Sequence, residues 1–235
     1  MNSRVILVSD DRSSLRSPDT LLWPDAACMR GIHTGEWTAH IFEYAMSFEG
    51  NMTQVRELAA ANGVGVLHPH GALATDPPGL IVCDVDSTVT RTEAIDLLAE
   101  CAGNADEVRE ITARAMVGEL DFTQSLYARV RCLEGLHIGA LEEAWKATVI
   151  TPGTAELVAA AHDVGAAVGL VSGGFTAIVD PLAEQIRADF AASNELEIVD
   201  NHLTGRVVGD IIDRAAKATW LRRWASERGV ALERT

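Results

Sequence analysis

The hydrophobic positions give residues 1–75 a different rhythm from the rest of the chain. Val5-Ile6-Leu7-Val8 predicts a strand, residues 53–62 carry a helical apolar pattern that ends at Gly63, and residues 64–67 predict another strand. Glycine suits that helix end because it adopts the left-handed backbone conformation at little cost. We therefore expect a small α/β accessory region, and we find no residues in it that indicate chemistry.

A second region begins after Asp76-Pro77-Pro78-Gly79, which has the composition of a linker. Just before it, His68 and His70 could bind a metal, although a solvated loop pair is favoured without a third ligand. The apolar run at 80–84 shows no alternation, which predicts a strand buried on both faces in a parallel sheet.

From residue 91 to about residue 148 the spacing of apolar residues is helical. Helices inserted directly after a first strand predict a helical cap over the carboxyl end of that strand. The helical spacing is carried by Val108, Ile111 and Ala115, by Phe122, Leu126 and Val130, and by Ile138, Leu141 and Trp145, with Asn104 and Asp121 as expected N-caps.

An alternation of helices and strands resumes after the cap, which favours an α/β fold. The expected elements are helix 153–164, strand 166–171, a tight turn at Ser172-Gly173-Gly174, helix 175–187, a short strand from 191, a hairpin within 196–209, and helix 213–228. We therefore divide the chain into an accessory region (1–75), a core built from 76–90 and 149–235, and a cap (91–148).

The composition is that of an ordinary globular protein, with 48% hydrophobic and 23% charged residues. A formal net charge of −15 argues against a nucleic acid or an anionic membrane as a partner, since both attract basic surfaces. The sequence has neither a secretory signal pattern nor an apolar run of about 18 residues, and we expect a cytoplasmic protein. Cysteines at positions 28, 83, 101 and 132 form no Cys-x-x-Cys pair, which favours reduced thiols.

Three polar signals lie at or near predicted strand ends, where open α/β sheets bind their ligands. Asp84 and Asp86 could be turn residues, but carboxylates buried without partners are costly, so such a pair usually serves a metal or a reaction. The backbone of Ser172-Gly173-Gly174 could cradle a phosphate, although Gly-Gly after a strand is ordinary. Lys217 alone would be a solvated helix lysine. The order of all three is more specific than any one of them.

This set resembles the phosphoserine phosphatases of the haloacid dehalogenase superfamily over residues 79–235. The resemblance is carried by 84–88, Glu93, 118–122, Ser125, Leu126, Arg129, 172–175, 194–197, Lys217 and Ala218. It implies a Rossmann-like three-layer α/β core with a helical cap inserted after the first core strand. It also implies Mg²⁺-dependent hydrolysis of O-phospho-L-serine through an aspartyl-phosphate, the last step of serine biosynthesis, and it leaves open whether the protein is a homodimer.

The resemblance implies a role for each matched residue. Asp84 would be the nucleophile and a Mg²⁺ ligand. Asp86 would be the general acid and base, with its carbonyl oxygen on the metal, and Lys217 would neutralise the phosphate. The implied substrate-binding residues are Ser172 and Gly173 for the phosphoryl group, Lys217 beside it, Glu93 for the ammonium, Arg129 for the carboxylate, and Met116 and Phe122 for the apolar side of the cap pocket.

Elementary chemistry agrees with these roles. A carboxylate attacks a phosphate dianion poorly unless cations neutralise the charge, which a metal ion and a lysine would do. A free amino-acid headgroup needs one anion and one cation, which Glu93 and Arg129 supply, and arginine can grip a carboxylate with two hydrogen bonds. Without the family, both residues would be interpreted as surface helix charges.

In that family a Gly-Asp-Gly-x-x-Asp motif follows one further strand and completes the metal site. This sequence ends at Thr235, and Asp210 cannot substitute because it precedes Lys217. We therefore expect a core truncated at its C-terminus, in which the strand before Asp84 is an exposed apolar edge. Two alternatives remain: an inactive fragment of such a phosphatase, or a related phosphatase for another small phosphomonoester. A receiver-type signalling domain is disfavoured because receivers lack the second aspartate of the Asp-x-Asp pair and a cap of this length.

Overall fold

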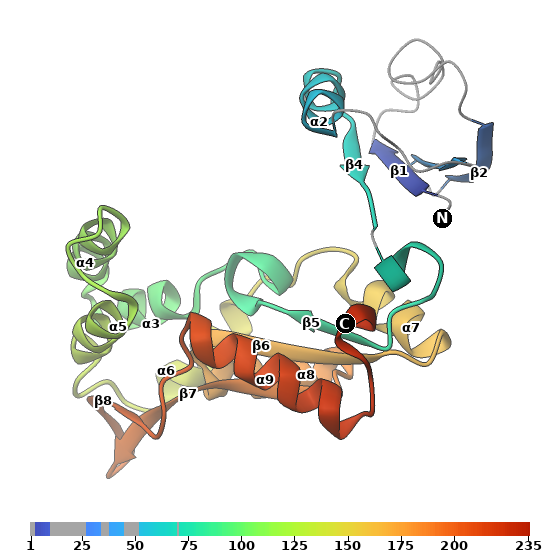
Figure 1. Cartoon of the computed structure of the whole chain (residues 1–235). Coiled ribbons are helices and arrows are strands. Elements are labelled where there is room, and N and C mark those ends of the chain that lie inside the picture. Colours follow the sequence, from blue (N-terminus) through green and yellow to red (C-terminus); the bar gives the residue numbers. More distant parts are fainter. Residues whose placement is uncertain (1–2, 10–26, 34–37, 45–51, 70) are drawn as a thin grey trace. The chain divides into compact units, whose positions relative to one another are not determined.

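The computed structural model describes residues 3–9, 27–33, 38–44, 52–69 and 71–235 (Figure 1). The chain forms two compact units, Met1–Asp76 and Pro77–Thr235. No helix in these described ranges has the length and hydropathy that a membrane span requires.

The first unit contains a four-stranded antiparallel sheet in the order β2-β3-β1-β4. The predicted strand, helix and strand correspond to β1, α2 and β4, whereas β2 and β3 were not predicted from their mixed polar and apolar sequences. His70, one of the two histidines considered as metal ligands, lies outside the described residues. The elements are β1 (Ser3–Ser9), β2 (Ala27–His33), β3 (Thr38–Tyr44), α2 (Met52–Ala61), β4 (Gly65–Leu67) and the short turn η1 (Gly71–Ala74).

The second unit is built on a sheet in the order β5-β6-β7-β8, in which β5, β6 and β7 are parallel and β8 runs antiparallel to β7. The strands are β5 (Leu80–Cys83), β6 (Ala167–Phe175), β7 (Phe190–Val199) and β8 (His202–Val208). The expectation that the first core strand is buried on both faces holds for Leu80, while the rest of β5 is partly exposed. Within the described residues β5 pairs with β6 on one side, which explains this exposure.

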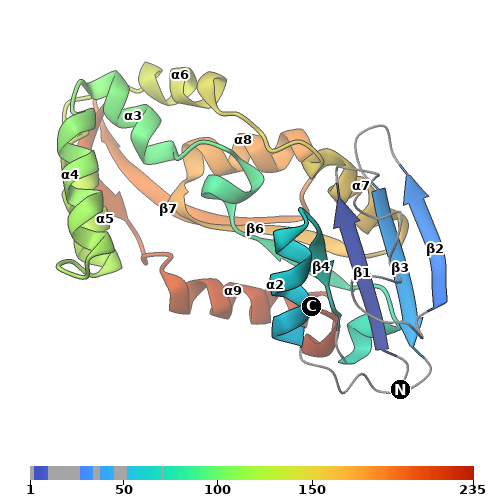
Figure 2. The same cartoon turned by 90° about the horizontal axis from the view of Figure 1, so that it is seen from above.

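Helices cover both faces of this sheet, which gives three layers (Figure 2). Val168 and Leu170 of β6 pack against α7 (Thr154–Asp163) and α8 (Thr176–Ile186), while Ala167 and Val171 pack on the side of α9 (Arg214–Glu227). Gly169 lies between Ala167 and Val171 in β6. A Cβ at Gly169 would lie 2.8 Å from ring atoms of Trp224 in α9. Glycine at this position therefore lets α9 approach the sheet closely.

The predicted cap consists of four helices: α3 (Ala94–Ala102), α4 (Ala105–Met116), α5 (Phe122–Arg131) and α6 (Gly139–Ala147). Asp121 caps α5 as expected, in a capping box with Gln124. Asn104 precedes α4 as expected but makes no side-chain cap; its amide instead donates to the Cys132 carbonyl at 2.6 Å. The cap core is apolar and includes Leu98, Val108, Leu126, Val130 and Leu133, with Leu196 and Leu203 from the β7–β8 hairpin.

The two chain segments that join cap and core pair with each other. The Arg91 amide donates to the Val149 carbonyl at 2.7 Å, and the Thr151 amide donates to the Val89 carbonyl at 2.9 Å. These bonds follow the short turn η2 (Val85–Val89), which leaves the end of β5. The pairing fixes where the chain enters α3, and so fixes the cap relative to β5.

The structure differs from two local predictions. Ser172-Gly173-Gly174 is not a tight turn but the extended end of β6, where the pairing register with β7 shifts between Val171 and Phe175. β7 is one continuous strand from Phe190 to Val199, not two short ones, because its first half pairs with β6 and its second half with β8.

Asp189 ties helix α7 to the sheet. Its Oδ2 accepts a hydrogen bond from the Val168 amide at 2.8 Å and lies 3.0 Å from Nε2 of His162. Partial burial acts to raise the pKa of Asp189, but the Val168 bond and His162 outweigh it, and the pKa lies below the ordinary value.

We expect Asp189→Asn to lower the free energy of unfolding by about 1–2 kcal/mol near neutral pH, because an amide is a weaker acceptor than a carboxylate. The folded pKa lies below the unfolded value of about 3.9. The stabilisation is therefore complete above that value and is lost as the pH falls through the folded pKa. Urea unfolding should give a difference between wild type and variant that shrinks as the pH falls from about 5 to about 3.

Asp163→Asn is the matched control, because Asp163 is an exposed carboxylate at the end of the same helix α7. It should change stability little at any of these pH values. A difference in the free energy of unfolding between wild type and Asp189→Asn that did not depend on pH would contradict the stabilising role assigned to the ionised Asp189.

Candidate active site

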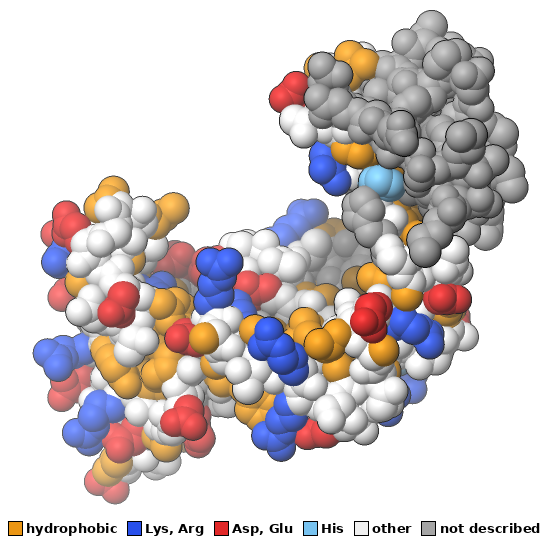
Figure 3. Space-filling view, in the orientation of Figure 1, with side chains coloured by type: hydrophobic (Ala, Val, Ile, Leu, Met, Phe, Trp, Pro, Cys, Tyr) orange, Lys and Arg blue, Asp and Glu red, His pale blue; other side chains and the backbone are white. Residues whose placement is uncertain are grey.

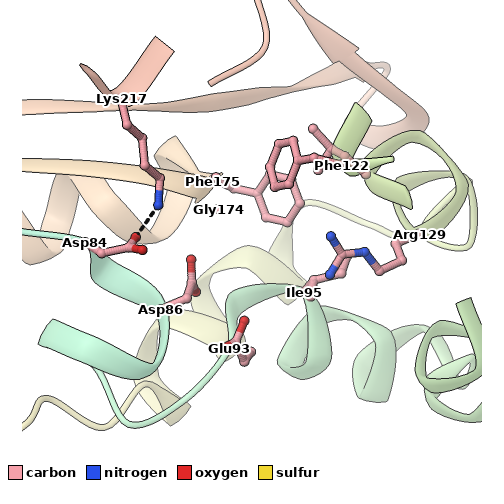
Figure 4. Close-up of a pocket in the computed structure, with 11 residues that line it drawn as sticks. Asp84, Asp86, Glu93, Ile95, Phe122, Arg129, Gly174, Phe175 and Lys217 are labelled. Carbon is pink, nitrogen blue, oxygen red and sulfur yellow. Dashed lines mark ion pairs between the residues drawn. The ribbon is translucent and has the colours of Figure 1, made fainter. Parts of the chain in front are cut away.

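A cavity of about 220 Å³ lies where the carboxyl ends of β5 and β6 meet the cap (Figure 4). Its walls come from η2, α3, α5, the end of β6 and the first turn of α9. It is lined by Asp84, Asp86, Glu93, Ile95, Phe122, Leu126, Arg129, Gly173, Gly174, Phe175 and Lys217.

Asp84 and Lys217 form an ion pair at the base of this cavity. Asp84 directly follows β5, and its Oδ1 accepts from the Val85 amide at 2.9 Å and lies 2.6 Å from Nζ of Lys217. Lys217 reaches this point from the first turn of α9, which begins at the N-cap Asp213. The Asp84 side chain is 49% exposed, so the ion pair lies open to the cavity.

Asp86 is held between the cap and the end of β6. Its Oδ1 accepts from the Ala94 amide at 2.9 Å, and its Oδ2 accepts from the Ser172 hydroxyl at 2.8 Å. The same hydroxyl accepts from the Gly174 amide at 2.7 Å. A Cβ at position 174 would lie 2.5 Å from Asp86 Oδ2, so the closeness of these groups depends on glycine there.

Glu93 is directed by a residue of η2. Ser87 has the left-handed backbone conformation, with φ of 54°, and its hydroxyl donates to Glu93 Oε1 at 2.5 Å. A serine in this conformation is uncommon, and such local strain gathers at functional sites. Glu93 directly precedes α3, so this bond places its carboxylate at the cap side of the cavity.

Arg129 enters the cavity from α5, opposite Asp86 and Glu93 (Figure 4). Its Nε donates to the Ser125 carbonyl at 3.3 Å, and none of the ion pairs in the described part of the chain includes it. Burial lowers the pKa of Arg129, and the carboxylates of Glu93, Asp96 and Asp86 act in the opposite direction. These carboxylates therefore favour the charged form of the guanidinium, although none of them forms an ion pair with it.

The ring of Phe122, from the cap helix α5, packs on Gly173 near the end of β6. A Cβ at Gly173 would lie 2.7 Å from the Phe122 ring, so the cap packs directly on this backbone. The other apolar residue expected here, Met116, is not in the lining and is 84% exposed. Ser172 is fully buried and reaches the site through its hydrogen bond to Asp86.

The structure thus brings together Asp84, Asp86, Glu93, Phe122, Arg129, Gly173 and Lys217 in one cavity, with Ser172 behind it and Met116 outside it. Sequence reasoning included Gly174 in a possible phosphate cradle but did not place it beside Asp86, because that position follows from packing. It missed Ile95, Leu126 and Phe175 as lining residues, because an apolar residue at a cavity wall has the same pattern as one in the core.

The charges of the cavity suit a hard divalent cation. Three carboxylates and two cationic side chains line it, so it has a net negative charge before any phosphate enters. Mg²⁺ is commonly held by one or two carboxylates and completes its shell with water and substrate phosphate. Asp84 offers such a carboxylate. Nowhere in the described ranges, this cavity included, do three or more His, Cys, Asp or Glu side chains gather into a closed metal site.

Comparisons with known proteins identify a family and several relatives. The model of the haloacid dehalogenase-like hydrolase family matches residues 81–235. A phosphoserine phosphatase of Streptomyces coelicolor is 49% identical over 177 residues, which cover 75% of this chain and 43% of that protein. One from Streptococcus thermophilus is 47% identical over 157 residues, which cover 67% of this chain and 73% of the relative.

Solved structures are similar as well. The unliganded structure of a probable phosphoserine phosphatase from Vibrio cholerae has a TM-score of 0.79 at 32% identity, and the match covers 99% of this chain and 71% of that one. A substrate-bound phosphoserine phosphatase complex has a TM-score of 0.63 at 38% identity and covers 67% of this chain and 75% of that one. The chain spans less than half the length of the relatives from Streptomyces coelicolor and Mycobacterium tuberculosis.

Proposed function

This chain belongs to the haloacid dehalogenase-like hydrolase family, and from that premise we propose that it hydrolyses O-phospho-L-serine to L-serine and phosphate. The proposal includes dependence on Mg²⁺ and an aspartyl-phosphate intermediate. It places the protein in the cytoplasm, at the last step of serine biosynthesis.

One observation carries the proposal. Glu93 and Arg129, a carboxylate and a guanidinium from the cap, line the same cavity as the Asp84–Lys217 ion pair and Asp86. The core side can therefore bind a phosphoryl group while the cap side offers one anion and one cation to an amino-acid headgroup. A cavity of about 220 Å³ suits a molecule of that size.

In the first step, a carboxylate oxygen of Asp84 attacks phosphorus, and the bond from phosphorus to the serine oxygen breaks. Asp86 gives its proton to the departing serine oxygen, which leaves as the free hydroxyl. Lys217 lies 2.6 Å from Asp84 Oδ1 and stabilises negative charge on the aspartyl and phosphoryl oxygens. The backbone at Gly173 and Gly174 faces the phosphoryl group from β6.

In the second step, Asp86 takes a proton from a water molecule as that water attacks phosphorus. The bond to Asp84 breaks, inorganic phosphate leaves, and both carboxyl groups return to their starting states. The hydrogen bonds from Ala94 and Ser172 hold the Asp86 carboxylate in place for both transfers. When bound at Asp84 and the Asp86 carbonyl, Mg²⁺ would supply positive charge for the phosphoryl oxygens.

The cap residues determine the substrate in this proposal. Glu93 receives the ammonium group, with its carboxylate aimed by Ser87. Arg129 receives the carboxylate, for which its planar guanidinium offers parallel N–H donors. The apolar ring of Phe122 covers the phosphoryl side and helps to exclude water.

The direct test is Mg²⁺-dependent release of phosphate from L-phosphoserine by the whole chain. We expect release that EDTA abolishes and added Mg²⁺ restores. We expect Asp84→Asn to lower turnover by on the order of 10³-fold or more, because the amide cannot act as the nucleophile. Its melting temperature should stay close to that of wild type, since Asp84 is half exposed and surface ion pairs contribute little to stability.

Asp210→Asn is the matched control, because Asp210 is an exposed aspartate outside the cavity lining, and it should keep full turnover. Turnover retained by Asp84→Asn would remove Asp84 as the nucleophile. Faster release from another phosphomonoester than from phosphoserine would assign the chain to a related phosphatase.

The second test concerns recognition of the headgroup. Arg129→Ala should lower kcat/KM for phosphoserine by roughly 10- to 100-fold, because it removes a charge-assisted contact to the substrate carboxylate. The same variant should change kcat/KM little for O-phosphoethanolamine, which has the phosphate and the amine but no carboxylate. Arg131→Ala, an exposed neighbour on α5, is the control for both substrates. Equal losses on the two esters would exclude Arg129 from carboxylate recognition.

A further inference from the structure

A buried asparagine behind the cavity connects two parts of the proposed site. Asn194 lies in β7, is 1% exposed and does not line the cavity. Its Nδ2 donates to the Gly173 carbonyl at 2.8 Å, and its Oδ1 accepts from the Ile212 amide at 2.8 Å. A carbonyl can only accept and an amide N–H can only donate, so both ends of this side chain are used in one fixed orientation.

The bond to Gly173 controls the backbone that faces the phosphoryl group. The C=O of Gly173 and the N–H of Gly174 belong to one planar trans peptide and point in opposite directions. Asn194 holds the C=O, so the N–H must point to the other side, where it donates to the Ser172 hydroxyl. That hydroxyl donates in turn to Asp86. A chain of three hydrogen bonds therefore runs from Asn194 to the proposed general acid.

The bond to Ile212 controls the approach of the lysine. Ile212 directly precedes Asp213, whose side chain caps α9 by accepting from the Ala216 amide at 2.8 Å. Lys217 lies in the first turn of that helix, and its Nζ reaches Asp84. The segment between β8 and α9 is thus tied to the sheet by Asn194 five residues before the lysine.

We propose that Asn194 is a positioning residue that sets the separation between the β6 backbone at 173–174 and the helix start that carries Lys217. This inference rests on the proposed phosphatase function, because it assigns both segments to one phosphoryl group. The side-chain amide of Asn194 is suited to holding these two segments together, because it offers a donor and an acceptor from one short, rigid group. Aspartate would present a second acceptor to the Gly173 carbonyl, and an apolar residue would leave both backbone groups unpaired.

The test compares Asn194→Ala with Asn104→Ala. Asn104 is a matched control, since its side-chain amide also joins two distant segments, with a 2.6 Å bond to the Cys132 carbonyl, but lies in the cap. Three quantities are measured in the whole chain: hydrogen exchange of the amides at 172–175 and 211–217, binding of inorganic phosphate by calorimetry, and kcat and KM for phosphoserine.

We expect Asn194→Ala to speed exchange in both segments by roughly 10-fold and to lower kcat/KM by about 100-fold, as displacements of about 1 Å do in active sites. Its phosphate affinity should fall, whereas Asn104→Ala should change none of these quantities, even if both variants melt at similarly lower temperatures. A loss of stability alone, with phosphate affinity and kcat/KM unchanged, would overturn the proposal.

The outcomes separate this inference from the proposed function. If wild type releases no phosphate from phosphoserine, the proposed function fails, and faster exchange in both segments still supports the coupling by Asn194. Faster exchange in only one segment, or in neither, overturns it. If Asn194→Ala does not fold, Asn194→Ser is tested in its place. Serine keeps a polar side chain but is too short to bond both the Gly173 carbonyl and the Ile212 amide. Failure of both variants to fold would make Asn194 a residue of the fold alone and would also overturn the proposal.

Discussion

The parallel pairing of β5 with β6 is the constraint on which the site depends. It brings the carboxyl ends of both strands to one edge of the sheet, with Cys83 opposite Leu170. Asp84 follows β5 at this edge, and β6 continues through Ser172 to Gly174 without turning away. The two segments can then exchange the hydrogen bonds that hold Asp86. Helix α9 covers the same sheet because Gly169 leaves room for Trp224, and it delivers Lys217 to Asp84.

Charge is the second constraint, because the chain has a formal net charge of −15 and the proposed substrate is an anion. On the face drawn in Figure 3, acidic and basic side chains are interspersed. Within the cavity, two cationic side chains offset this unfavourable net charge. Lys217 and Arg129 enter the cavity from opposite sides, one from α9 and one from α5, so each end of the proposed substrate meets a cation. In the proposed function, the carboxylates between them serve the ammonium group and the chemistry, and Mg²⁺ supplies the remaining positive charge.

Much of the fold was predictable because its signals are local. The order of helices and strands, the cap inserted after β5, and the N-cap at Asp121 all follow from short-range patterns. The strands β2 and β3 and the extended Ser172-Gly173-Gly174 segment depend on partners distant in sequence, so local patterns did not predict them. The same is true of the site: Asp84, Asp86 and Lys217 were expected together, but the bonds of Asn194 to Gly173 and Ile212 became evident only in three dimensions.

In the proposed mechanism, the decisive step is the phosphorylation of Asp84 during turnover. The most direct test of this step is to quench the protein with borohydride during steady-state hydrolysis of phosphoserine, and then to map the reduced residue by mass spectrometry. Borohydride reduces an acyl phosphate to an alcohol, which marks the phosphorylated residue. We expect reduction at Asp84 alone, dependent on phosphoserine and lost when substrate is exhausted. Continued phosphate release with no reduction at residue 84, or with reduction at Asp86 instead, would contradict it.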